Sequence, residues 1–313
     1  MRILHKFNGL YTQFFGLVDN VMLSTKPLTA PTKAIEYLKK YTYALDNVQK
    51  IETSDKYPNK IWQLWFQGEE QMPPIVKSCT NSVKHYHNDD VIFLTYDNLK
   101  DYTDFPDYII EKHKKGIIPY ANLSDMVRLT LLAKYGGCWV DSTVYLTGRI
   151  PDDILNADFF TFRSFHSDAY RCIDSYDEFK MYSNFFKEPM SIESPFFLKS
   201  NAGGDIVNCI LALFFEYWKH ENNLTDYLMI DKFFNLVLIN KKELRKQFLE
   251  MPKYYIPQVL LLQDAIFEHF DQKTFDCIKK SSNIHKLTYK NLSRSPFKDS
   301  FLEYIINTPV DKV

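Results

Sequence analysis

The chain has 313 residues, enough to bury a large core, and we expect one large α/β domain with additions at its ends. Its 38 basic and 39 acidic side chains nearly balance, so its charge does not suggest a nucleic-acid partner. No stretch reaches the roughly 20 apolar residues of a transmembrane helix. The five cysteines are scattered without a C-x-x-C pair, which indicates neither a zinc site nor a disulfide framework and favours a reducing cytoplasm.

Residues 1–57 are predicted to form a helical extension. Residues 1–24 superficially resemble a signal peptide, but polar residues and a glycine interrupt the apolar run, so we expect a retained helix. A second helix is expected to run from an N-cap at Thr32 toward Lys50. These helices either pack on the following domain, which we favour, or rest on a membrane surface.

The next segments alternate between strand and helix patterns. Residues 60–66 and 91–95 have strand character, and residues 75–86 between them have helix character. This βαβ unit implies a parallel sheet. Further along, strands are expected at 158–163 and 194–200, and helices at 205–220 and 223–240.

Residues 120–146 bring helix, turn, strand and carboxylate together in quick succession. A helix over 121–135 should end at the pair Gly136-Gly137, and a short strand should follow and end at Asp141. In open α/β sheets, ligands bind at the carboxyl ends of strands. Asp125 and Arg128 share one face of the helix and alone would indicate only an ion pair, but beside Asp141 they become candidate site residues.

Three landmarks of this sequence are spaced as in a known family. The first is the pattern Ser124-Asp125, Arg128, Tyr135-Gly136-Gly137 and Trp139-Val140-Asp141-Ser142-Thr143; the others are residues 60–65 and 284–290. In this order they resemble the capsular polysaccharide synthesis glycosyltransferases, which are relatives of the glycosyltransferases with a DxD sugar-binding region. The resemblance implies a GT-A-type, Rossmann-like open and mostly parallel sheet with flanking helices and added N-terminal and C-terminal helices.

The resemblance also implies a domain organisation. Residues 58–292 would form the GT-A-like catalytic domain, with a nucleotide-sugar half over 58–146 and an acceptor and closing half over 147–292. Residues 1–57 would precede it and residues 293–313 would form a tail. The polar, aromatic-rich stretch 168–193 is where we expect acceptor-binding loops, since loops on a rigid sheet commonly bind ligands.

By the same resemblance, a Mn²⁺ or Mg²⁺ ion would be held by Asp141, Thr143 and His285. Thr143 stands where a DxD motif has its second carboxylate, and a neutral oxygen is a poorer ligand for a hard dication. Lys286 and Lys290 would neutralise the donor's diphosphate, as fixed cations do for phosphate groups.

The remaining site residues concern the donor. The resemblance places contacts to the base at Trp62, Gln63 and Trp65, although either tryptophan could equally belong to the core. Asp125 and Arg128 would contact the sugar hydroxyls or the phosphates. Asp226 or Asp231, in the pattern Asp-Tyr-x-x-x-Asp, would face the sugar, while the alternative for Asp226 is an ordinary residue beside a helix N-cap.

The predicted function is a metal-dependent, retaining hexosyltransferase. It would move a hexose from a nucleotide sugar, UDP-linked by preference, to a lipid-linked capsular or exopolysaccharide repeat unit. It would act in the cytoplasm, with peripheral contact to the inner face of the membrane as a further possibility. The alternatives are a protein-directed glycosyltransferase of the same fold and a catalytically inactive member that binds carbohydrate or nucleotide.

Overall fold

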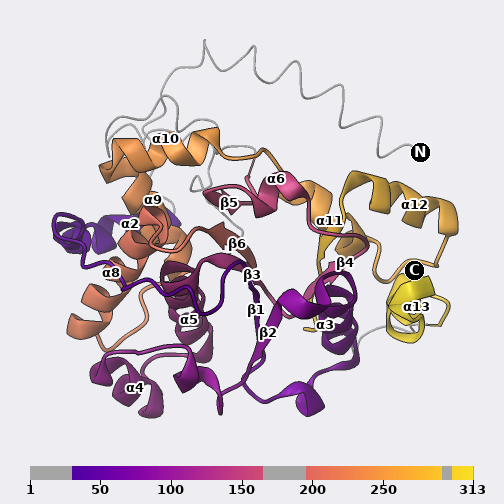
Figure 1. The fold of residues 1–313 in the computed structure, drawn as a ribbon, viewed down its shortest axis with the longest axis horizontal. Coiled ribbons are helices and arrows are strands. Elements are labelled where there is room, and N and C mark those ends of the chain that lie inside the picture. The colour runs from indigo at the N-terminus through magenta and orange to yellow at the C-terminus, as the bar shows by residue number, and fades with distance from the viewer. Residues whose placement is uncertain (1–29, 165–194, 291–297, 313) are drawn as a thin grey trace, which may run out of the picture.

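The computed structural model describes residues 30–164, 195–290 and 298–312, with side chains from residue 33 onward. Helices cover both faces of an open, mostly parallel sheet, and further helices lie at both ends of the described chain (Figure 1). This confirms the predicted fold class. The helix expected over 1–24 and the acceptor-binding loops expected over 168–193 lie outside the described residues.

The central sheet has five strands in the order β2-β1-β3-β6-β5. β1 pairs in parallel with β2 and β3, whereas β6 is antiparallel to both of its neighbours. A second sheet pairs β4 and β7 in antiparallel fashion. The strand bounds are β1 Ile61–Leu64, β2 Val91–Leu94, β3 Gly137–Val140, β4 Val144–Leu146, β5 Phe159–Thr161, β6 Phe197–Ser200 and β7 Ile284–Lys286.

The helices form two groups on either side of the central sheet. One core cluster joins β1 and β3 to α5, α8 and α9, and two others join the sheets to α3, α11, α12 and α13. The helix bounds are α2 Ala30–Leu38, α3 Pro74–His87, α4 Asp107–Lys114, α5 Tyr120–Tyr135, α6 Asp152–Leu155, α8 Asp205–His220, α9 Met229–Asn240, α10 Lys242–Glu250, α11 Ile256–Asp264, α12 Gln272–Ser281 and α13 Phe301–Asn307. Short 3₁₀ helices are η2 Lys39–Leu45, η3 Glu69–Gln71, η4 Asn88–Asp90, η5 Leu99–Asp101 and η8 Val310–Lys312.

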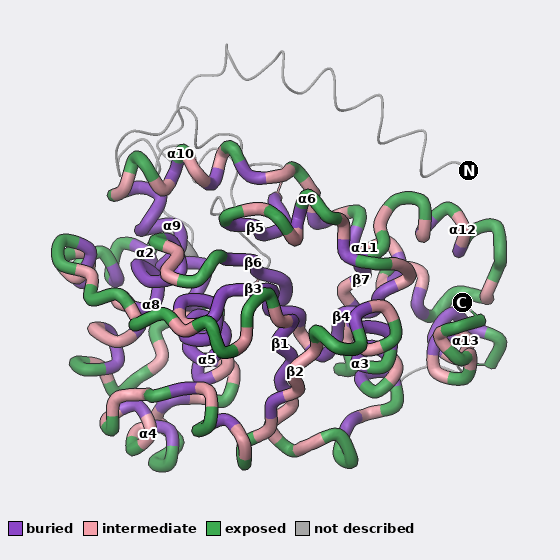
Figure 2. Tube along the Cα trace, in the orientation of Figure 1, coloured by how far each residue is buried: buried purple, intermediate pink, exposed green. Residues whose placement is uncertain are grey.

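Alternation along the strands explains the two groups. Trp62 and Trp139 pack toward α5, whereas Ile61, Cys138 and Val140 pack toward the opposite cluster, as the two-residue period of a strand requires. α5 is buried along most of its length and lies in the middle of the fold (Figure 2). A helix that is buried on nearly all sides belongs to a core, so polar residues on α5 need a specific reason to be there.

Most predicted elements agree with the structure to within a few residues, and α8 matches its predicted bounds. Two helices differ. α9 begins at Met229 rather than 223, because a non-helical turn precedes it in which the Asp226 carboxylate accepts the Leu228 N–H at 2.8 Å. α2 begins at Ala30, so Thr32 lies inside it, and the chain tightens to a 3₁₀ helix that ends at Leu45.

The described part of the N-terminal extension packs on the domain. Tyr37, Lys40 and Tyr41 all donate hydrogen bonds to Glu221 Oε1, just beyond α8, at 2.5–2.8 Å. At the other end, α13 packs its apolar face against α3. None of the described helices is long and apolar enough to span a bilayer.

The turn Gly136-Gly137 joins α5 to β3 and requires glycine at both positions. Their φ angles are 69° and 91°, a region that side chains disfavour. A Cβ on Gly137 would lie 2.1 Å from the Lys60 carbonyl oxygen, and one on Gly136 would lie 2.7 Å from the Ala202 nitrogen. The absence of side chains here therefore lets β3 approach β1 closely enough to pair.

We expect Gly137→Ala to lower the free energy of unfolding by roughly 2–5 kcal/mol, because the positive φ and the clash with the backbone both oppose it. Gly116→Ala is the matched control, since Gly116 has a φ of 73° and open space around its Cβ position. Its free energy of unfolding should fall by only roughly 1–2 kcal/mol, the cost of placing alanine in a left-handed backbone conformation. Urea unfolding measures both, and equal losses would contradict a close-approach role for Gly137.

Candidate functional site

A cleft with a volume of about 550 Å³ opens where β1 and β3 end. Because these strands are parallel, their carboxyl ends lie at the same edge of the sheet. The N-terminal half of α5, the turn before α9 and the chain after β7 complete its walls. It brings together seven of the sequence-predicted residues: Trp65, Asp125, Arg128, Asp141, Thr143, Lys286 and Lys290.

Arg128 links the two carboxylates of the cleft. Its Nη2 lies 3.3 Å from Asp125 Oδ1 and 3.6 Å from Asp141 Oδ1, and its Nη1 donates to the Pro195 carbonyl. The guanidinium carbon lies 4.9 Å from the Trp139 ring centroid, a cation–π geometry. Arg128 is only 6% exposed, so its charge is held in one place.

Asp141 is oriented by contacts on both carboxylate oxygens. Trp139 Nε1 donates to Oδ1 at 2.8 Å, and Lys286 Nζ lies 3.4 Å from Oδ2. Burial acts to raise the pKa of Asp141, but Arg128 and Lys286 together outweigh it and hold the pKa below its ordinary value. Asp141 is therefore an ionised, fixed acceptor at neutral pH.

Asp125 lies in a different environment from Asp141. It is 6% exposed, and burial raises its pKa to about 7, against the opposing effect of Arg128 and with added repulsion from Asp141. Near neutral pH its carboxyl group therefore exchanges between a hydrogen-bond donor and an acceptor. Two neighbouring carboxyl groups with pKa values pushed apart are characteristic of functional sites.

Lys286 enters the cleft from the last strand. β7 pairs with β4 so that Lys286 lies opposite Val144, next to Thr143. Its ammonium group donates to Thr143 Oγ1 and faces Asp141 Oδ2. Lys290 lines the outer part of the cleft, with its Nζ 5.8 Å from the ring centroid of Tyr227.

The structure does not bring Trp62, Gln63 or His285 to the cleft. Trp62 and Gln63 are fully buried in β1, and Trp62 Nε1 donates to the Gly136 carbonyl at 2.9 Å. His285 alternates with Lys286 along β7 and so faces the opposite way. There its Nε2 lies 2.9 Å from Thr147 Oγ1, and burial lowers its pKa to about 3. His285 therefore lies away from the predicted metal position, and Trp62 and Gln63 lie away from the cleft where a base would bind.

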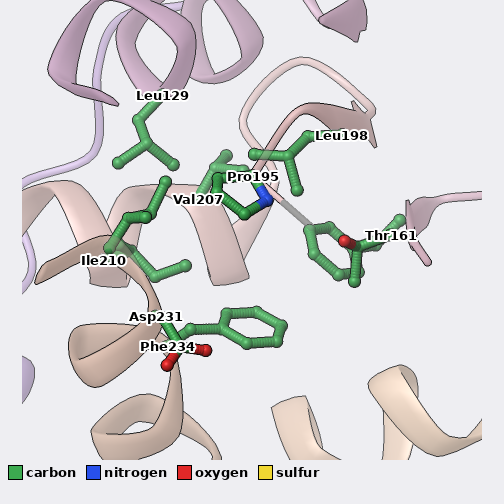
Figure 3. Close-up of a pocket in the computed structure, with 10 residues that line it drawn as sticks. Leu129, Thr161, Pro195, Leu198, Val207, Ile210, Asp231 and Phe234 are labelled. Carbon is green, nitrogen blue, oxygen red and sulfur yellow. The ribbon is translucent and has the colours of Figure 1, made fainter. Parts of the chain in front are cut away.

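Asp226 and Asp231 also lie outside the cleft lining, although the turn between them contributes to it. Lys232 Nζ lies 3.1 Å from Asp231 and 3.8 Å from Asp226. These two ion pairs connect the turn before α9 to the first turn of the helix. Asp231 instead borders a mostly apolar pocket beside Phe234 (Figure 3). With a volume of about 20 Å³, that pocket is far too small for a sugar ring.

The cleft residues do not fit the predicted divalent metal. Within the described ranges, no three His, Cys, Asp or Glu side chains are placed to hold a metal ion. The oxygens of Asp141 and Thr143 that would coordinate it already contact the Lys286 ammonium, and Asp141 Oδ1 contacts Trp139 and Arg128. A dication would have to displace a fixed positive charge.

Sequence reasoning missed the aromatic rim and two supporting residues. Tyr120, Tyr227 and Tyr289 line the cleft and are 55%, 60% and 40% exposed. Ser124 Oγ accepts from Arg128 at 3.3 Å, and Trp139 orients Asp141. One signal was available for part of this set, since residues 120, 124 and 128 recur every four positions and so share a helix face.

Comparison with known proteins finds a matching family, a curated relative and a solved structure. The model of a family described as capsular polysaccharide synthesis protein matches residues 29–305. A curated relative, O-glycosyltransferase braB of Annulohypoxylon truncatum, is 31% identical over 114 residues, which cover 33% of this chain and 26% of that protein. The solved structure of PaToxG Glycosyltransferase aligns with 90% of this chain and 95% of its own, at 13% identity and a TM-score of 0.37.

The fold and the cleft define an α/β protein with a charged cleft at one edge of its central sheet. The match over most of the chain shows that it belongs to the capsular polysaccharide synthesis protein family. The curated relative is named as an O-glycosyltransferase, and the matched segment spans about a quarter of its length.

The raised pKa of Asp125 predicts a pH dependence of stability. The folded protein keeps a proton on Asp125 that the unfolded chain releases above its ordinary pKa of 3.8, so folding loses stability as the pH rises from about 4 to about 7. Asp125→Asn should remove this loss. The melting temperature should therefore fall less between pH 5 and pH 8 in Asp125→Asn than in the wild type.

The control for this comparison is Asp97→Asn, which changes an exposed carboxylate outside the cleft. It should keep the pH dependence of the wild type. Parallel pH dependence in the wild type and Asp125→Asn would show that Asp125 is ionised in the folded protein across this range.

Proposed function

We propose that the protein is a glycosyltransferase that moves a hexose from a nucleotide sugar, UDP-linked by preference, to a saccharide acceptor in capsule or exopolysaccharide synthesis. One observation carries the proposal: a cleft at the carboxyl ends of parallel strands is lined by Arg128, Lys286 and Lys290 together with Asp125 and Asp141. A nucleotide sugar needs both kinds of charge, cations for its diphosphate and carboxylates for its hydroxyl groups.

The cations suit the leaving group. When the bond from sugar to diphosphate breaks, negative charge grows on the departing phosphate, and fixed cations stabilise it without having to reorganise. Lys286, at the end of β7, and Lys290, just after it, both line the cleft. Trp65, with its ring edge-on to Tyr289 at 5.4 Å between centroids, offers an aromatic surface for the base.

The carboxylates suit the transferred sugar. Asp141 is an ionised acceptor, and Asp125 can donate or accept near neutral pH. Charged hydrogen bonds from fixed groups orient a polyol strongly, and orientation itself contributes to rate. Retention of configuration stays a prediction that rests on the resemblance, and the anomeric proton of the product, observed by NMR, would test it.

The exposed tyrosines favour a saccharide acceptor. Tyr120 and Tyr227 stand at the cleft with more than half of their surface exposed, and aromatic faces pack well on the apolar faces of sugar rings. A lipid-linked acceptor at the inner face of the membrane and a cytoplasmic location remain predictions from the sequence. The alternatives, a polypeptide acceptor and an inactive binding member, are separated by the measurement below.

Purified protein should release UDP from a UDP-hexose, slowly with water alone and faster with a saccharide acceptor. Asp141→Asn should lower this turnover at least about 100-fold, because it removes the ionised acceptor of the cleft. Its melting temperature should show that it folds, and Asp97→Asn should retain wild-type turnover. Near-wild-type turnover in Asp141→Asn would exclude Asp141 from the reaction.

The wild type also tests the proposal by itself. Turnover only with a polypeptide acceptor would favour the protein-directed enzyme. Nucleotide binding without turnover of UDP-, GDP-, CDP- or dTDP-linked hexoses, with or without Mn²⁺, would favour the inactive binding member.

A further inference from the structure

The Lys286 ammonium group lies where the two predicted metal ligands of the strand end converge. It donates to Thr143 Oγ1 and is 3.4 Å from Asp141 Oδ2. The remaining oxygen of Asp141 contacts Trp139 Nε1 at 2.8 Å and Arg128 Nη2 at 3.6 Å. A lysine therefore occupies the position that a DxD-type motif would give to a cation.

The backbone holds Lys286 in this position from both sides. Lys286 pairs with Val144 across the β4–β7 ladder, and the next residue, Leu287, donates its N–H to the Thr143 carbonyl at 2.9 Å. The ammonium also lies 5.6 Å from the Phe196 ring centroid. The lysine side chain is 24% exposed, so its charge is well placed but still reachable by a ligand in the cleft.

Charge in the cleft makes a second cation at this point unfavourable. Like charges a few ångströms apart repel strongly where water is partly excluded. Arg128 and Lys286 already contact the two carboxylates, and Lys290 lines the same cleft. Burial keeps the Asp125 carboxyl partly protonated near pH 7, which leaves the cleft more positive and ready for an anion.

We propose that Lys286 takes the place of the divalent metal, so that the protein binds the nucleoside diphosphate part of its donor without Mn²⁺ or Mg²⁺. The inference rests on the proposed function and deepens it: the cation that meets the diphosphate belongs to the chain. Thr143 and Asp141 then serve as the groups that position the lysine, and the neutral Thr143 suits this role better than a second carboxylate, which would neutralise the charge that the diphosphate needs.

The first experiment is calorimetric titration of the full chain, freed of metal with EDTA, with UDP. GDP, CDP and dTDP follow if UDP gives no heat. The expected result is a Kd that changes less than about threefold when Mn²⁺ or Mg²⁺ is added, because each dication would compete with the ammonium. Binding that requires Mn²⁺ or Mg²⁺ would overturn this inference and leave the proposed function standing. No binding of any of the four, with or without metal, would overturn both.

Variants at Lys286 supply the second experiment. Lys286→Met keeps the length of the side chain and removes its charge, and should weaken metal-free nucleotide binding at least about tenfold. Lys286→Arg keeps the charge and should stay within a few-fold of the wild type. Lys77→Met, at an exposed position of α3 outside the cleft, is the matched control and should bind as the wild type does. Unchanged binding in Lys286→Met, shown to be folded by its melting temperature, would overturn the inference.

A third variant exchanges one cation for the other. Lys286→Ala vacates the space between Asp141 and Thr143, so with UDP present it should bind Mn²⁺ more tightly than the wild type. The loss of the free-Mn²⁺ signal in electron paramagnetic resonance measures this binding without reference to activity. Tighter Mn²⁺ binding in the wild type than in Lys286→Ala would show that the lysine does not hold the metal's position.

Discussion

The buried guanidinium of Arg128 is the constraint around which the cleft is arranged. A charge on a core helix is tolerated only when it is paired and hydrogen-bonded, and Arg128 meets that condition with Asp125 on its own helix, Asp141 after β3 and the Pro195 carbonyl before β6. Three separate segments are thereby held at one point. The polar residues of α5, which first looked out of place in so buried a helix, are what connects the core to the site.

Packing on either side of Arg128 explains why the neighbouring carboxyl groups differ. Asp125 lies on the buried helix beside Arg128, whereas Asp141 lies at a strand end between Arg128 and Lys286 and accepts a hydrogen bond from Trp139. The Gly136-Gly137 turn lets β3 pair with β1, and this pairing places Asp141 at the edge of the sheet.

Local patterns made much of this structure predictable from the sequence. The βαβ start, the helix with its glycine stop and the strand ending at Asp141 depend on residues close together in the chain, and the order of landmarks added Lys286 and Lys290. The direction in which side chains point along the strands could not be predicted. β1 is buried on both faces and β7 has three residues, so neither shows the polar alternation that would have separated Trp62 from Trp65 or His285 from Lys286. Helix propensity does not reveal that α9 begins only at Met229. The positions of Asp226 and Asp231 outside the cleft lining could therefore not be predicted.

The pairing of β4 with β7 also affects the order in which the cleft can form during synthesis. Synthesis runs from the N-terminus, so the five strands of the central sheet leave the ribosome well before β7 at 284–286. A nascent chain that has already folded this sheet carries Arg128, Asp125 and Asp141 but not the lysine that completes their arrangement. The proposed donor recognition therefore depends on the pairing of β7 with β4, which can form only after every strand of the central sheet has been synthesised.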